Sequence, residues 1–386
     1  MTVRVLVDAT AVPVDRGGVG RYLDALLPEL GTLDVDLVLV TQQHDRESFA
    51  AAVPQARVVC APGWASRPAV RLVWEQLGMP LLARRVRADV VHSPHYTMPL
   101  VATVPVVVTL HDATFFSDPG LHSPVKARFF RVATRVAGRL AARIVVPSEA
   151  TRAEVVRLAG VDANKTAVAL HGVDTTVFHA PSAEVVARVA ARLGLVGRRW
   201  VAFLGTIEPR KNVPALVGSW ARAVADDPDP PALVLAGGAG WDTGVDDAVA
   251  AVPDRLTVVR PGYLPLSDLP GLLGGAEVVA YPSLGEGFGL PVLEAMACGA
   301  AVLTTRRLAL PEVGGDAVAY CDVDQDSIAG GLTRLLGDRA ERERLAEAAE
   351  SRAAEFTWAR AADSHLSAYR AVAGRGPWWR RARGKR

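Results

Sequence analysis

The chain has 386 residues, of which 50% are hydrophobic and 22% are charged, and its formal net charge at pH 7 is +2. This composition is typical of a folded protein with two domains, and it argues against a disordered chain or a strongly basic nucleic-acid-binding protein. The three cysteines show no paired or metal-ligand spacing, and no apolar run reaches membrane-spanning length, so we expect a cytoplasmic protein without a zinc site or disulfides.

Short apolar runs alternate with helical patterns along the whole chain. In the first half, the runs predict strands at 3–8, 35–40, 57–60, 89–93, 104–110, 143–148 and 166–170. In the second half, they predict strands at 200–205, 232–238, 256–260, 277–283, 301–305 and 317–321. Near-continuous apolar strands separated by helices indicate parallel sheets covered on both faces, so we expect an α/β protein with two doubly wound domains.

A glycine-rich segment, "DATAVPVDRGGVGRY" (8–22), follows the first strand and opens a helix. Its G-G-x-G pattern, at Gly17, Gly18 and Gly20, lacks the spacing of a dinucleotide fingerprint. The loop is able to approach a phosphate or a sugar, and an ordinary mobile loop is the alternative.

A histidine and an aspartate end a predicted central strand of the first half, in "VTLHDATFFSD" (108–118). His111 is able to hydrogen-bond a substrate hydroxyl there. The alternative is a capped turn in which Asp112 binds local backbone amides.

The segment "PVKARFFRVATRVAGRLAAR" (124–143) has helical periodicity with two predicted faces. One face carries Arg128, Arg131, Arg135, Arg139 and Arg143, and the other carries Phe129, Val132, Val136 and Leu140. A solvated basic surface and a membrane-docking surface are the two interpretations.

The boundary between the domains is expected near residue 178, where strand character ends and Pro181 introduces a new helix. Beyond it, "GTIEPRKN" (205–212) ends the first strand of the second half with Arg210 and Lys211. Two cations at the carboxyl end of a strand are suited to neutralising a diphosphate, whereas ordinary solvated charges would be mildly unfavourable at a helix start.

The stretch "GEGFGLPVLEAMACG" (285–299) joins a strand to a helix that should begin near Leu290. Its glycines allow backbone N–H groups to approach an anion, and the helix N-terminus adds partial positive charge. The two carboxylates, Glu286 and Glu294, suit hydroxyl groups, so the segment predicts a nucleotide-sugar site. A tight turn with two solvated acids is the alternative reading.

The ordered set of motifs resembles retaining glycosyltransferases of family 4, which have the two-domain GT-B fold. "EGFGLPVLEAMACG" resembles the E-x7-E motif of this family. The other matching motifs, in chain order, are "VVPSEATR", "HGVD", "GTIEPRKN", "LPEVGGDA" and "FTWARAADSHLSAYRAV". "WEQLGMP" and "LHDATFF" are similar to the mannosyltransferase-like branch.

The resemblance implies two Rossmann-like domains that face a central cleft. The acceptor-side domain would span 1–178 and be completed by a helix at 357–373, and the nucleotide-sugar-binding domain would span 179–356. A basic aromatic tail, 374–386, would follow them.

The resemblance also implies residue roles. Glu286 would contact hydroxyls of the donor sugar, and Glu294 would contact the ribose. Lys211 would bind the diphosphate, and His111 would lie near the reacting sugar. The backbone of a further set of residues would hold the sugar and phosphates: Gly18, Phe288, Gly289 and Leu290.

The sequence departs from the family pattern at two positions. Thr206 stands where the family often has an arginine, for which Arg210 is a candidate substitute, and His171 stands where an asparagine is common. Stabilisation of the departing diphosphate by Lys211 and Arg210 would need no divalent metal, and "DVDQD" (322–326) is better explained as a helix cap than as a metal site.

We therefore expect a retaining hexosyltransferase without a cofactor, with GDP-mannose as the favoured donor and a UDP-sugar as the alternative. The acceptor would be a glycan or a lipid-linked sugar. Trp378 and Trp379 in the basic tail suit contact with an anionic membrane at the cytoplasmic face. The competing hypotheses are a glycosidase, an epimerase of the same fold and a non-catalytic nucleotide-sugar-binding protein.

Overall fold

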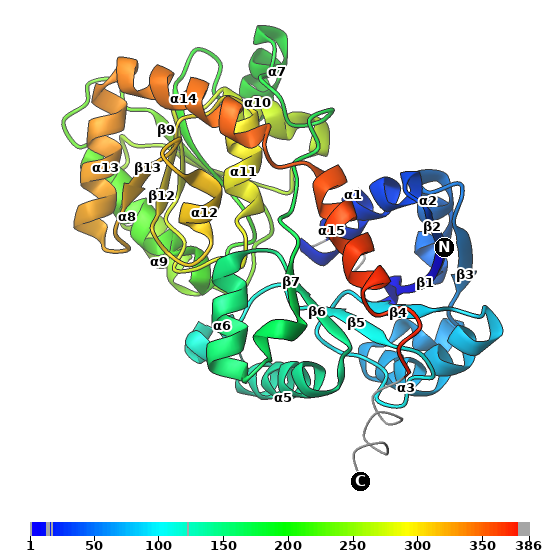
Figure 1. Cartoon of the computed structure of the whole chain (residues 1–386). Helices are drawn as coiled ribbons and strands as arrows, with labels where there is room; N and C mark the ends of the chain where they lie inside the picture. Colours follow the sequence, from blue (N-terminus) through cyan, green and yellow to red (C-terminus); the bar gives the residue numbers. More distant parts are fainter. Residues whose placement is uncertain (1, 13–15, 17, 122, 377–386) are drawn as a thin grey trace. The chain divides into compact units, whose positions relative to one another are not determined.

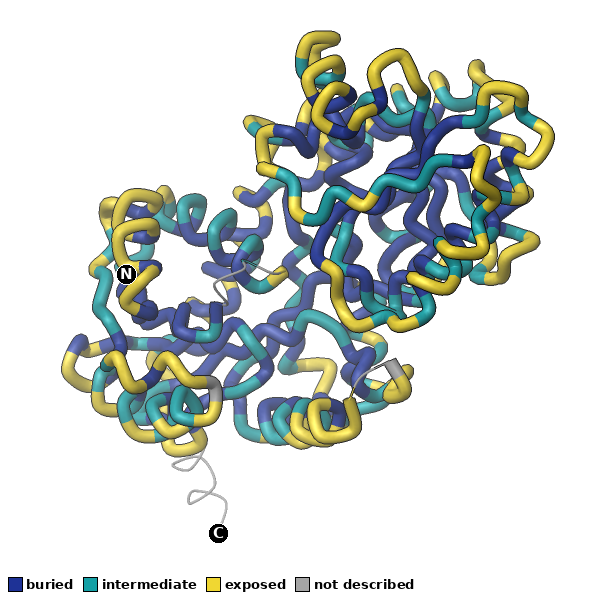
Figure 2. The backbone as a smooth tube through the Cα atoms, turned by 180° about the vertical axis from the view of Figure 1, so that it is seen from behind, coloured by how far each residue is buried: buried dark blue, intermediate teal, exposed yellow. Residues whose placement is uncertain are grey.

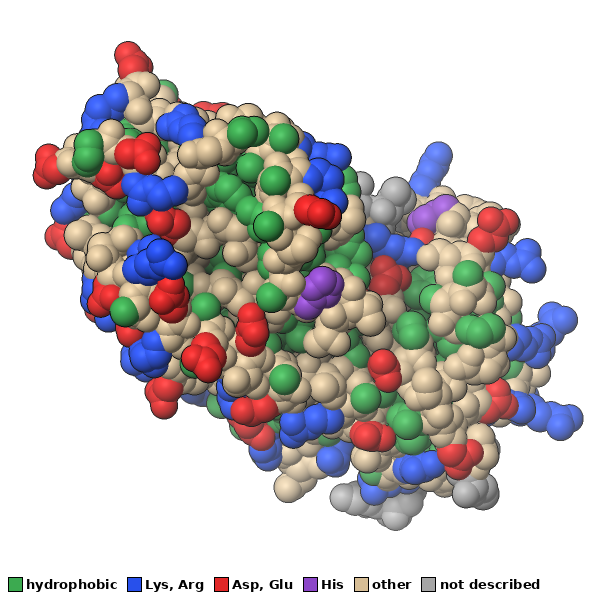
Figure 3. Space-filling model, turned by 90° about the horizontal axis from the view of Figure 1, so that it is seen from above, with side chains coloured by type: hydrophobic (Ala, Val, Ile, Leu, Met, Phe, Trp, Pro, Cys, Tyr) green, Lys and Arg blue, Asp and Glu red, His purple; other side chains and the backbone are tan. Residues whose placement is uncertain are grey.

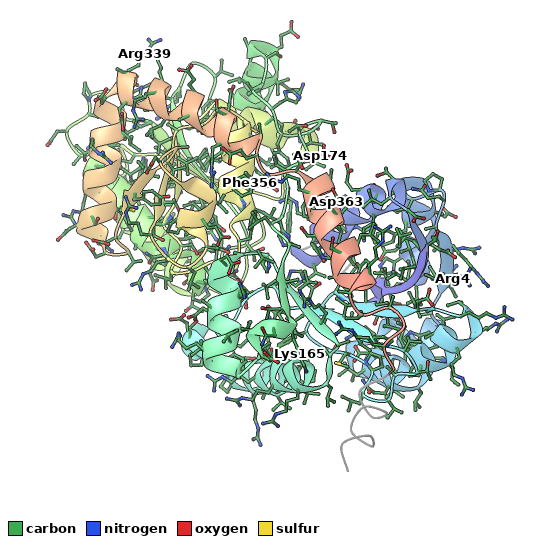
Figure 4. The ribbon with its side chains drawn as sticks, in the orientation of Figure 1. Arg4, Lys165, Asp174, Arg339, Phe356 and Asp363 are labelled. Atoms are coloured by element: carbon green, nitrogen blue, oxygen red, sulfur yellow. The ribbon has the colours of Figure 1, made fainter. Side chains whose placement is uncertain are left out.

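The computed structural model describes residues 2–12, 16, 18–121 and 123–376. The chain forms two compact units, Met1–Gly172 with the chain from Thr357 onward, and Val173–Phe356. The structural boundary thus falls before the expected position at residue 178. The chain enters the second unit at Val173 and leaves it after Phe356, which is labelled in Figure 4 together with Asp363 of the C-terminal helix.

The first unit contains a parallel sheet of seven strands in the order β3-β2-β1-β4-β5-β6-β7. Its strands are β1 (Val3–Asp8), β2 (Val35–Thr41), β3 (Arg57–Cys60), β4 (Val90–Ser93), β5 (Val106–Thr109), β6 (Arg143–Val146) and β7 (Thr166–Val168). The strands are mainly apolar, with Val and Leu side chains packed beneath the covering helices. The inner strands β1, β4 and β5 are almost fully buried, whereas the edge strand β3 is partly exposed, and Figure 2 colours the chain by this burial.

The helices of the first unit include the last helix of the chain. They are α1 (Gly18–Thr32), α2 (Arg46–Ala52), α3 (Pro68–Arg85), α4 (Thr114–Ser117), α5 (Pro124–Leu140), α6 (Glu149–Ala159) and α15 (Trp358–Arg370). Helix α15 packs against α1, as Figure 1 shows with α15 in red and α1 in blue. Residues of α3 and α5 share one buried apolar cluster with β1, β4, β5 and β6, so these two helices cover the same face of the sheet.

The second unit contains a parallel sheet of six strands in the order β10-β9-β8-β11-β12-β13. Its strands are β8 (Trp200–Leu204), β9 (Ala232–Ala236), β10 (Val258–Gly262), β11 (Val278–Tyr281), β12 (Val302–Thr305) and β13 (Ala319–Cys321). Its helices are α7 (Ala183–Leu193), α8 (Val213–Ala223), α9 (Gly244–Ala250), α10 (Leu269–Gly274), α11 (Leu290–Ala297), α12 (Leu310–Gly314), α13 (Gln325–Gly337) and α14 (Arg339–Ala353).

All thirteen predicted strands are present, and the α/β class with two doubly wound sheets is confirmed. Most strands are shorter than their apolar runs, and β10 begins two residues later than expected. Asp324 caps α13 by accepting a hydrogen bond from the Ser327 amide, so the helix-cap interpretation of 322–326 is also confirmed.

The predicted division of α5 into one basic and one apolar face is wrong. Phe129 and Val132 are exposed, whereas Arg131 is half-buried and donates to the Phe115 carbonyl. Arg143 lies outside the helix, in β6. The buried face instead consists of small or short side chains, namely Ala127, Thr134, Ala137 and Gly138. Helix α5 therefore presents a mixed apolar and basic surface to solvent.

The surface of the described residues carries charges of both signs, which are interspersed on the face drawn in Figure 3. In the part of the chain that the structure describes, no helix combines the length and apolar character needed to cross a bilayer. Trp378 and Trp379 of the predicted tail lie outside the described residues.

Candidate functional site in the second unit

The glycine-rich turn between β11 and α11 adopts a backbone that requires glycine. Gly289 precedes α11 with a φ of +111°, and a Cβ atom there would lie 3.0 Å from the Leu310 side chain. Pro291 occupies the first turn, and α11 begins at Leu290 as predicted. The first N–H groups of the helix have no intrahelical acceptor, so the turn presents donors and a helix dipole at the carboxyl edge of the sheet.

Glu286 is the centre of a buried ionic cluster. Its Oε1 atom accepts hydrogen bonds from Lys211 Nζ at 2.6 Å, Ser283 Oγ at 2.7 Å and Tyr281 Oη at 3.1 Å. Its Oε2 atom accepts from Arg210 Nη1. Because an ionised carboxylate has about four acceptor sites, the protein fills Oε1 and leaves acceptor capacity on Oε2.

Both cations come from the turn Pro209–Lys211 between β8 and α8. Arg210 also donates to the Gly285 carbonyl at 2.9 Å and pairs with Glu208 at 2.6 Å. Lys211 additionally donates to the hydroxyl of Tyr281 and lies 4.9 Å from the centroid of that ring. The sequence-predicted residues Glu286, Lys211 and Arg210 are therefore brought together.

The electrostatics of the cluster keep Glu286 ionised. Burial alone would raise the pKa of this carboxyl, but Arg210 and Lys211 outweigh burial and lower it to about 2. Burial and the neighbouring Arg210 lower the pKa of Lys211, and Glu286 opposes that shift. The carboxylate thus holds two cations that burial would otherwise disfavour.

The remaining predicted residues of this unit lie along the same segment. Glu294 is in α11 and only 4% exposed, and Phe288 is also 4% exposed and packs edge-on against Phe356. Leu290 is half-buried at the first position of α11.

Sequence reasoning missed three polar members of the cluster: Glu208, Tyr281 and Ser283. Tyr281 ends an otherwise apolar strand, and its ring is stacked on Phe203 with centroids 5.7 Å apart. The sequence did contain a signal for two of them. The segment "AYPS" places a tyrosine and a serine at the carboxyl end of a buried strand, where ligands of parallel sheets bind.

The histidine network of the first unit

The two predicted residues of the first unit are His111 and Gly18. Gly18 is the first residue of α1 and has open space around it. His111 is half-buried, and its Nε2 atom donates to the Pro94 carbonyl at 2.7 Å. Burial lowers the pKa of His111, so the neutral ring keeps Nδ1 as an acceptor. Asp112 accepts from the Thr114 amide, which is the predicted capped turn.

A chain of hydrogen bonds runs beneath His111 and joins α15 to the sheet. His365 Nδ1 donates to the Ala361 carbonyl at 2.7 Å, so its Nε2 accepts from the Tyr22 hydroxyl at 2.6 Å. Tyr22 is 3.2 Å from Thr109 Oγ1, which lies 2.9 Å from His92 Nε2. Each donor is matched to one acceptor, so the network fixes the neutral tautomers of its rings.

Burial is the main cause of the low pKa values of these histidines. It lowers the pKa of His365 to about 4 and that of His95 to about 3, and it lowers the pKa of His92 and His171 well below the ordinary value. The first unit therefore carries a group of buried histidines that are neutral in the folded state.

Among the described residues, no three His, Cys, Asp or Glu side chains are grouped in a way that could hold a metal ion. Lys211, Arg210 and the N-terminus of α11 are the groups that favour an anionic ligand, and they lie within one unit.

Relationship to known proteins

Two sequence families match the chain in succession. Residues 16–177 match Glycosyltransferase Family 4, and residues 188–352 match Glycosyl transferases group 1. The O-antigen chain mannosyltransferase B of Escherichia coli is 30% identical over 284 residues, covering 72% of this chain and 73% of the relative. The D-inositol 3-phosphate glycosyltransferase of Mycobacterium tuberculosis is 29% identical, covering 93% and 80%.

Solved structures show the same fold. Anabaena HepE in complex with UDP-glucose has a TM-score of 0.75 at 18% identity, covering 96% of this chain and 100% of that one. WaaG, a glycosyltransferase involved in lipopolysaccharide biosynthesis, has a TM-score of 0.72 at 14% identity, with coverage of 96% and 100%.

The two parallel-sheet units have the GT-B fold of these structures. The chain belongs to glycosyltransferase family 4, and it is a retaining enzyme that transfers a sugar from a nucleotide-sugar donor.

Proposed function

We propose that the protein transfers mannose from GDP-mannose to a glycan or lipid-linked acceptor. The family relationship and the name of the Escherichia coli relative support mannose as the sugar. A UDP-sugar is the alternative donor, which the UDP-glucose complex of HepE favours.

The observation that carries the proposal is the pairing of Lys211 and Arg210 with Glu286 beside the α11 N-terminus. In retaining transfer on one face of the sugar, the bond from the anomeric carbon to the diphosphate oxygen breaks, and a bond to the acceptor oxygen forms. The leaving diphosphate oxygen takes the acceptor proton. Negative charge accumulates on the diphosphate, so fixed cations and backbone donors stabilise the transition state.

We assign separate roles to the residues around the donor. Lys211, Arg210 and the amides near Gly289 and Leu290 bind the diphosphate. The acceptor capacity left on Glu286 Oε2 binds a hydroxyl of the donor sugar. Glu294, one turn into α11, binds the ribose.

In the first unit, we assign the Nδ1 acceptor of His111 to a hydroxyl of the reacting sugar. Gly18, with open space around its Cα, is assigned to a close approach by the donor phosphates. The backbone of Phe288 completes the sugar contacts.

We propose that no divalent metal takes part, because Lys211, Arg210 and the backbone amides at the N-terminus of α11 together supply the hydrogen-bond donors that the leaving group needs. Full activity in the presence of EDTA is the expected result. A requirement for added magnesium would contradict this part of the proposal.

The glycosidase alternative is disfavoured by the ionisation of Glu286. A glycosidase needs one carboxylic acid with a raised pKa as proton donor, and the pKa of Glu286 is lowered to about 2. An epimerase and a non-catalytic binding protein remain distinguishable by assay, because only a transferase converts an added acceptor into a glycosylated product.

We further propose that the enzyme docks peripherally on anionic membrane through α5, at the cytoplasmic face. Phe129 and Val132 are 41% and 54% exposed, and Val125 is 81% exposed. Exposed arginines flank them on the same helix, at positions 128, 135 and 139. Apolar side chains surrounded by cations are suited to the interface of anionic lipid.

The experiment that tests the proposed function is a thermal-shift panel of nucleoside diphosphates, followed by turnover with the matching nucleotide sugars. A ligand at 100 times its dissociation constant adds roughly 2.7 kcal/mol to the free energy of unfolding, which is readily measured. We expect the largest shift with GDP and transfer from GDP-mannose. A larger shift with UDP would indicate that the donor is a UDP-sugar and not GDP-mannose. No shift with any nucleotide would contradict the proposal.

A further inference from the structure

A second group of charged side chains lies in the first unit, where β1 ends against α3. Asp8 is the last residue of β1, and Arg71 and Glu75 are one turn apart on α3. Arg71 Nη1 lies 3.2 Å from Glu75 Oε2 and 3.6 Å from Asp8 Oδ2. Thr97 donates to Glu75 Oε2 at 2.5 Å and accepts from Arg71 at 3.3 Å. These residues, with Ser93, are called the Asp8 cluster below.

The Asp8 cluster contains more negative charge than its own structure needs. The side chains of Asp8 and Glu75 are 3% and 1% exposed, and one arginine at 12% faces both. One buried acid would balance that arginine, and a second buried carboxylate costs free energy unless something else compensates it. Burial and, next, Asp8 raise the pKa of Glu75 to about 7, despite Arg71 and Thr97.

One carboxylate oxygen of the cluster lacks a good hydrogen bond. Asp8 Oδ1 accepts from the amide and the hydroxyl of Thr10, at 3.0 and 2.5 Å. Its other oxygen, Oδ2, faces Arg71 at 3.6 Å, which is longer than a hydrogen bond. Among the described residues, no other donor reaches it.

A buried hydroxyl without a partner lies on the neighbouring strand. Ser93 ends β4, is 2% exposed, and its Oγ atom has no hydrogen-bond partner among the described residues. Leu6 and Val91 both belong to the core beneath α3 and α5. Side chains two residues apart on a strand point to the same face of the sheet. Asp8 is two residues after Leu6, and Ser93 is two residues after Val91, so both belong to the face covered by α3 and α5.

The cluster also lies where doubly wound sheets bind ligands. Asp8 and Ser93 are the last residues of adjacent strands, and His111 follows the next strand, β5, at the same carboxyl edge. Ligands of open parallel sheets occupy this edge. A carboxylate oxygen of Asp8 that lacks a good hydrogen bond, and a hydroxyl of Ser93 without a partner among the described residues, therefore belong to the ends of two neighbouring strands, at an edge where ligands bind.

We propose that the Asp8 cluster is the acceptor subsite and that it selects a neutral, hydroxyl-rich sugar ring over a phosphorylated one. This inference rests on the proposed function, because it assumes a sugar acceptor. Hydroxyls of a sugar donate to Asp8 Oδ2 and accept from Ser93 and Arg71, which matches the groups left open. A phosphate at this position would face two acids against one cation and would be repelled.

The test measures the binding of small glycosides to the full-length protein by saturation-transfer NMR, without a donor. The neutral probes are the methyl glycosides of mannose, glucose and galactose, and the anionic probe is mannose 6-phosphate. We expect at least one neutral glycoside to bind the wild type at least tenfold more tightly than the phosphate ester. Asp8→Asn and Glu75→Gln should each weaken its binding at least tenfold.

A matched control is Asp36→Asn, which removes the carboxylate that pairs with Arg4 at 2.6 Å near the amino ends of β1 and β2. It should leave glycoside binding unchanged. In the same preparations, the thermal shift with nucleoside diphosphate and the hydrolysis of the donor without acceptor should match those of the wild type for Asp36→Asn.

Three results would overturn the inference: no neutral glycoside binds, mannose 6-phosphate binds better, or both cluster variants bind glycoside as the wild type does. Failure of the proposed function looks different, because the wild type would then show neither a nucleotide shift nor donor hydrolysis, whatever the glycosides do. Thermal unfolding of each variant separates a lost subsite from a lost fold.

Discussion

The ammonium nitrogen of Lys211 lies 2.6 Å from Oε1 of Glu286, and both side chains are only 8% exposed. The two residues belong to segments 75 positions apart, and the sheet brings β8 and β11 together as neighbours. The carboxylate thus fixes a cation at the edge of the sheet before any ligand arrives. Such preorganisation is the main source of electrostatic stabilisation in enzymes.

Replacement of Lys211 by Met should therefore lower kcat more than it raises the KM of the donor. The charge of the leaving group is greatest in the transition state, and loss of one fixed positive group typically costs about 10² to 10³ in kcat. Steady-state kinetics with the nucleotide sugar measure this. Lys165→Met is the matched control, since that ammonium lies in the other unit, where it donates to the carbonyls of Gly138 and Arg139. Lys165 is labelled in Figure 4. Unchanged kcat in the Lys211 variant would place the phosphate site elsewhere.

The two acids of the E-x7-E motif should differ in what they change. Glu294→Ala should weaken nucleotide binding, whereas Glu286→Ala should mainly reduce turnover, because the Glu286 carboxylate pairs with both Arg210 and Lys211. A lost hydrogen bond to a charged group costs about 1.5 to 3 kcal/mol, or roughly one to two decades in the affected constant. Calorimetric titration with nucleoside diphosphate and initial rates separate the two effects. Equal losses of affinity in both variants would contradict the assignment.

The histidine network of the first unit predicts acid sensitivity. A histidine whose folded pKa is lowered stays neutral in the native state, while the unfolded chain binds protons below about pH 6.5. Its contribution to stability is complete above that pH and is lost as the pH falls toward 4, where His365 titrates. Thermal unfolding should show the midpoint falling between pH 7 and 5. A midpoint that stayed constant or rose would show that these rings are not held neutral.

Tyr22→Phe should destabilise the network by about 1 to 3 kcal/mol, because His365 Nε2 would lose its buried donor. Hydrogen exchange should increase in α15, which this hydroxyl connects to the sheet. If hydrogen exchange increased only in helices other than α15, the network would not connect α15 to the sheet.

The raised pKa of Glu75 predicts that stability falls as the pH rises, which is the opposite of the effect of the histidines. Its folded pKa is raised from 4.5 to about 7, so ionisation destabilises the fold progressively as the pH rises between these values. Glutamine resembles the protonated acid, so Glu75→Gln should match the wild type near pH 5. It should be more stable by about 3 kcal/mol at pH 8, since each unit of pKa shift corresponds to about 1.4 kcal/mol. Chemical denaturation at the two pH values measures the difference.

A variant that loses acceptor binding while gaining stability would also show that Glu75 is retained for function rather than for folding. If Glu75→Gln were instead less stable than the wild type at pH 8, the carboxylate would be a structural partner of Arg71, and the excess-charge argument for the Asp8 cluster would fail.

The sequence was sufficient to predict both sheets because most strands are short, mainly apolar runs bounded by turn residues. It also predicted the start of α11, since Pro291 is favoured at a first helical position and Gly299 as a C-terminal cap. The pairing of Glu286 with Arg210 and Lys211 was not predictable, because it depends on which strands become neighbours. The hydrogen bond from Tyr281 to Glu286 was not predictable for the same reason.

The face of α5 that packs on the core was mispredicted for a different reason. Helical periodicity specifies stripes but not which stripe is buried. Gly138 approaches so closely that a Cβ atom there would lie 2.8 Å from Val161, so small residues make the close contact. Hydropathy gives small residues little weight as buried positions. It therefore predicted that Phe129 and Val132 would be buried, whereas both are exposed.

That exposed face gives the last prediction. The double variant Phe129→Ser, Val132→Ser should reduce co-sedimentation with liposomes containing anionic lipid at least fivefold, because two apolar side chains no longer enter the interface. Binding of the wild type should also fall with added salt, since each basic residue near the surface contributes on the order of 1 kcal/mol. Val196→Ser, which changes a 73% exposed valine in the second unit, is the matched control.

A version of the chain that ends at Gly374 separates the contribution of the tail from that of α5. If truncation alone abolished binding and the α5 variant bound normally, the tail would be the docking element. Equal binding of every variant to neutral and anionic liposomes would remove membrane docking from the proposal, and efficient transfer to a water-soluble glycoside would then identify a soluble acceptor. Because the α5 variants leave Lys211 and the Asp8 cluster intact, their turnover on soluble substrates should equal that of the wild type, so any loss confined to liposome-bound acceptor is due to docking.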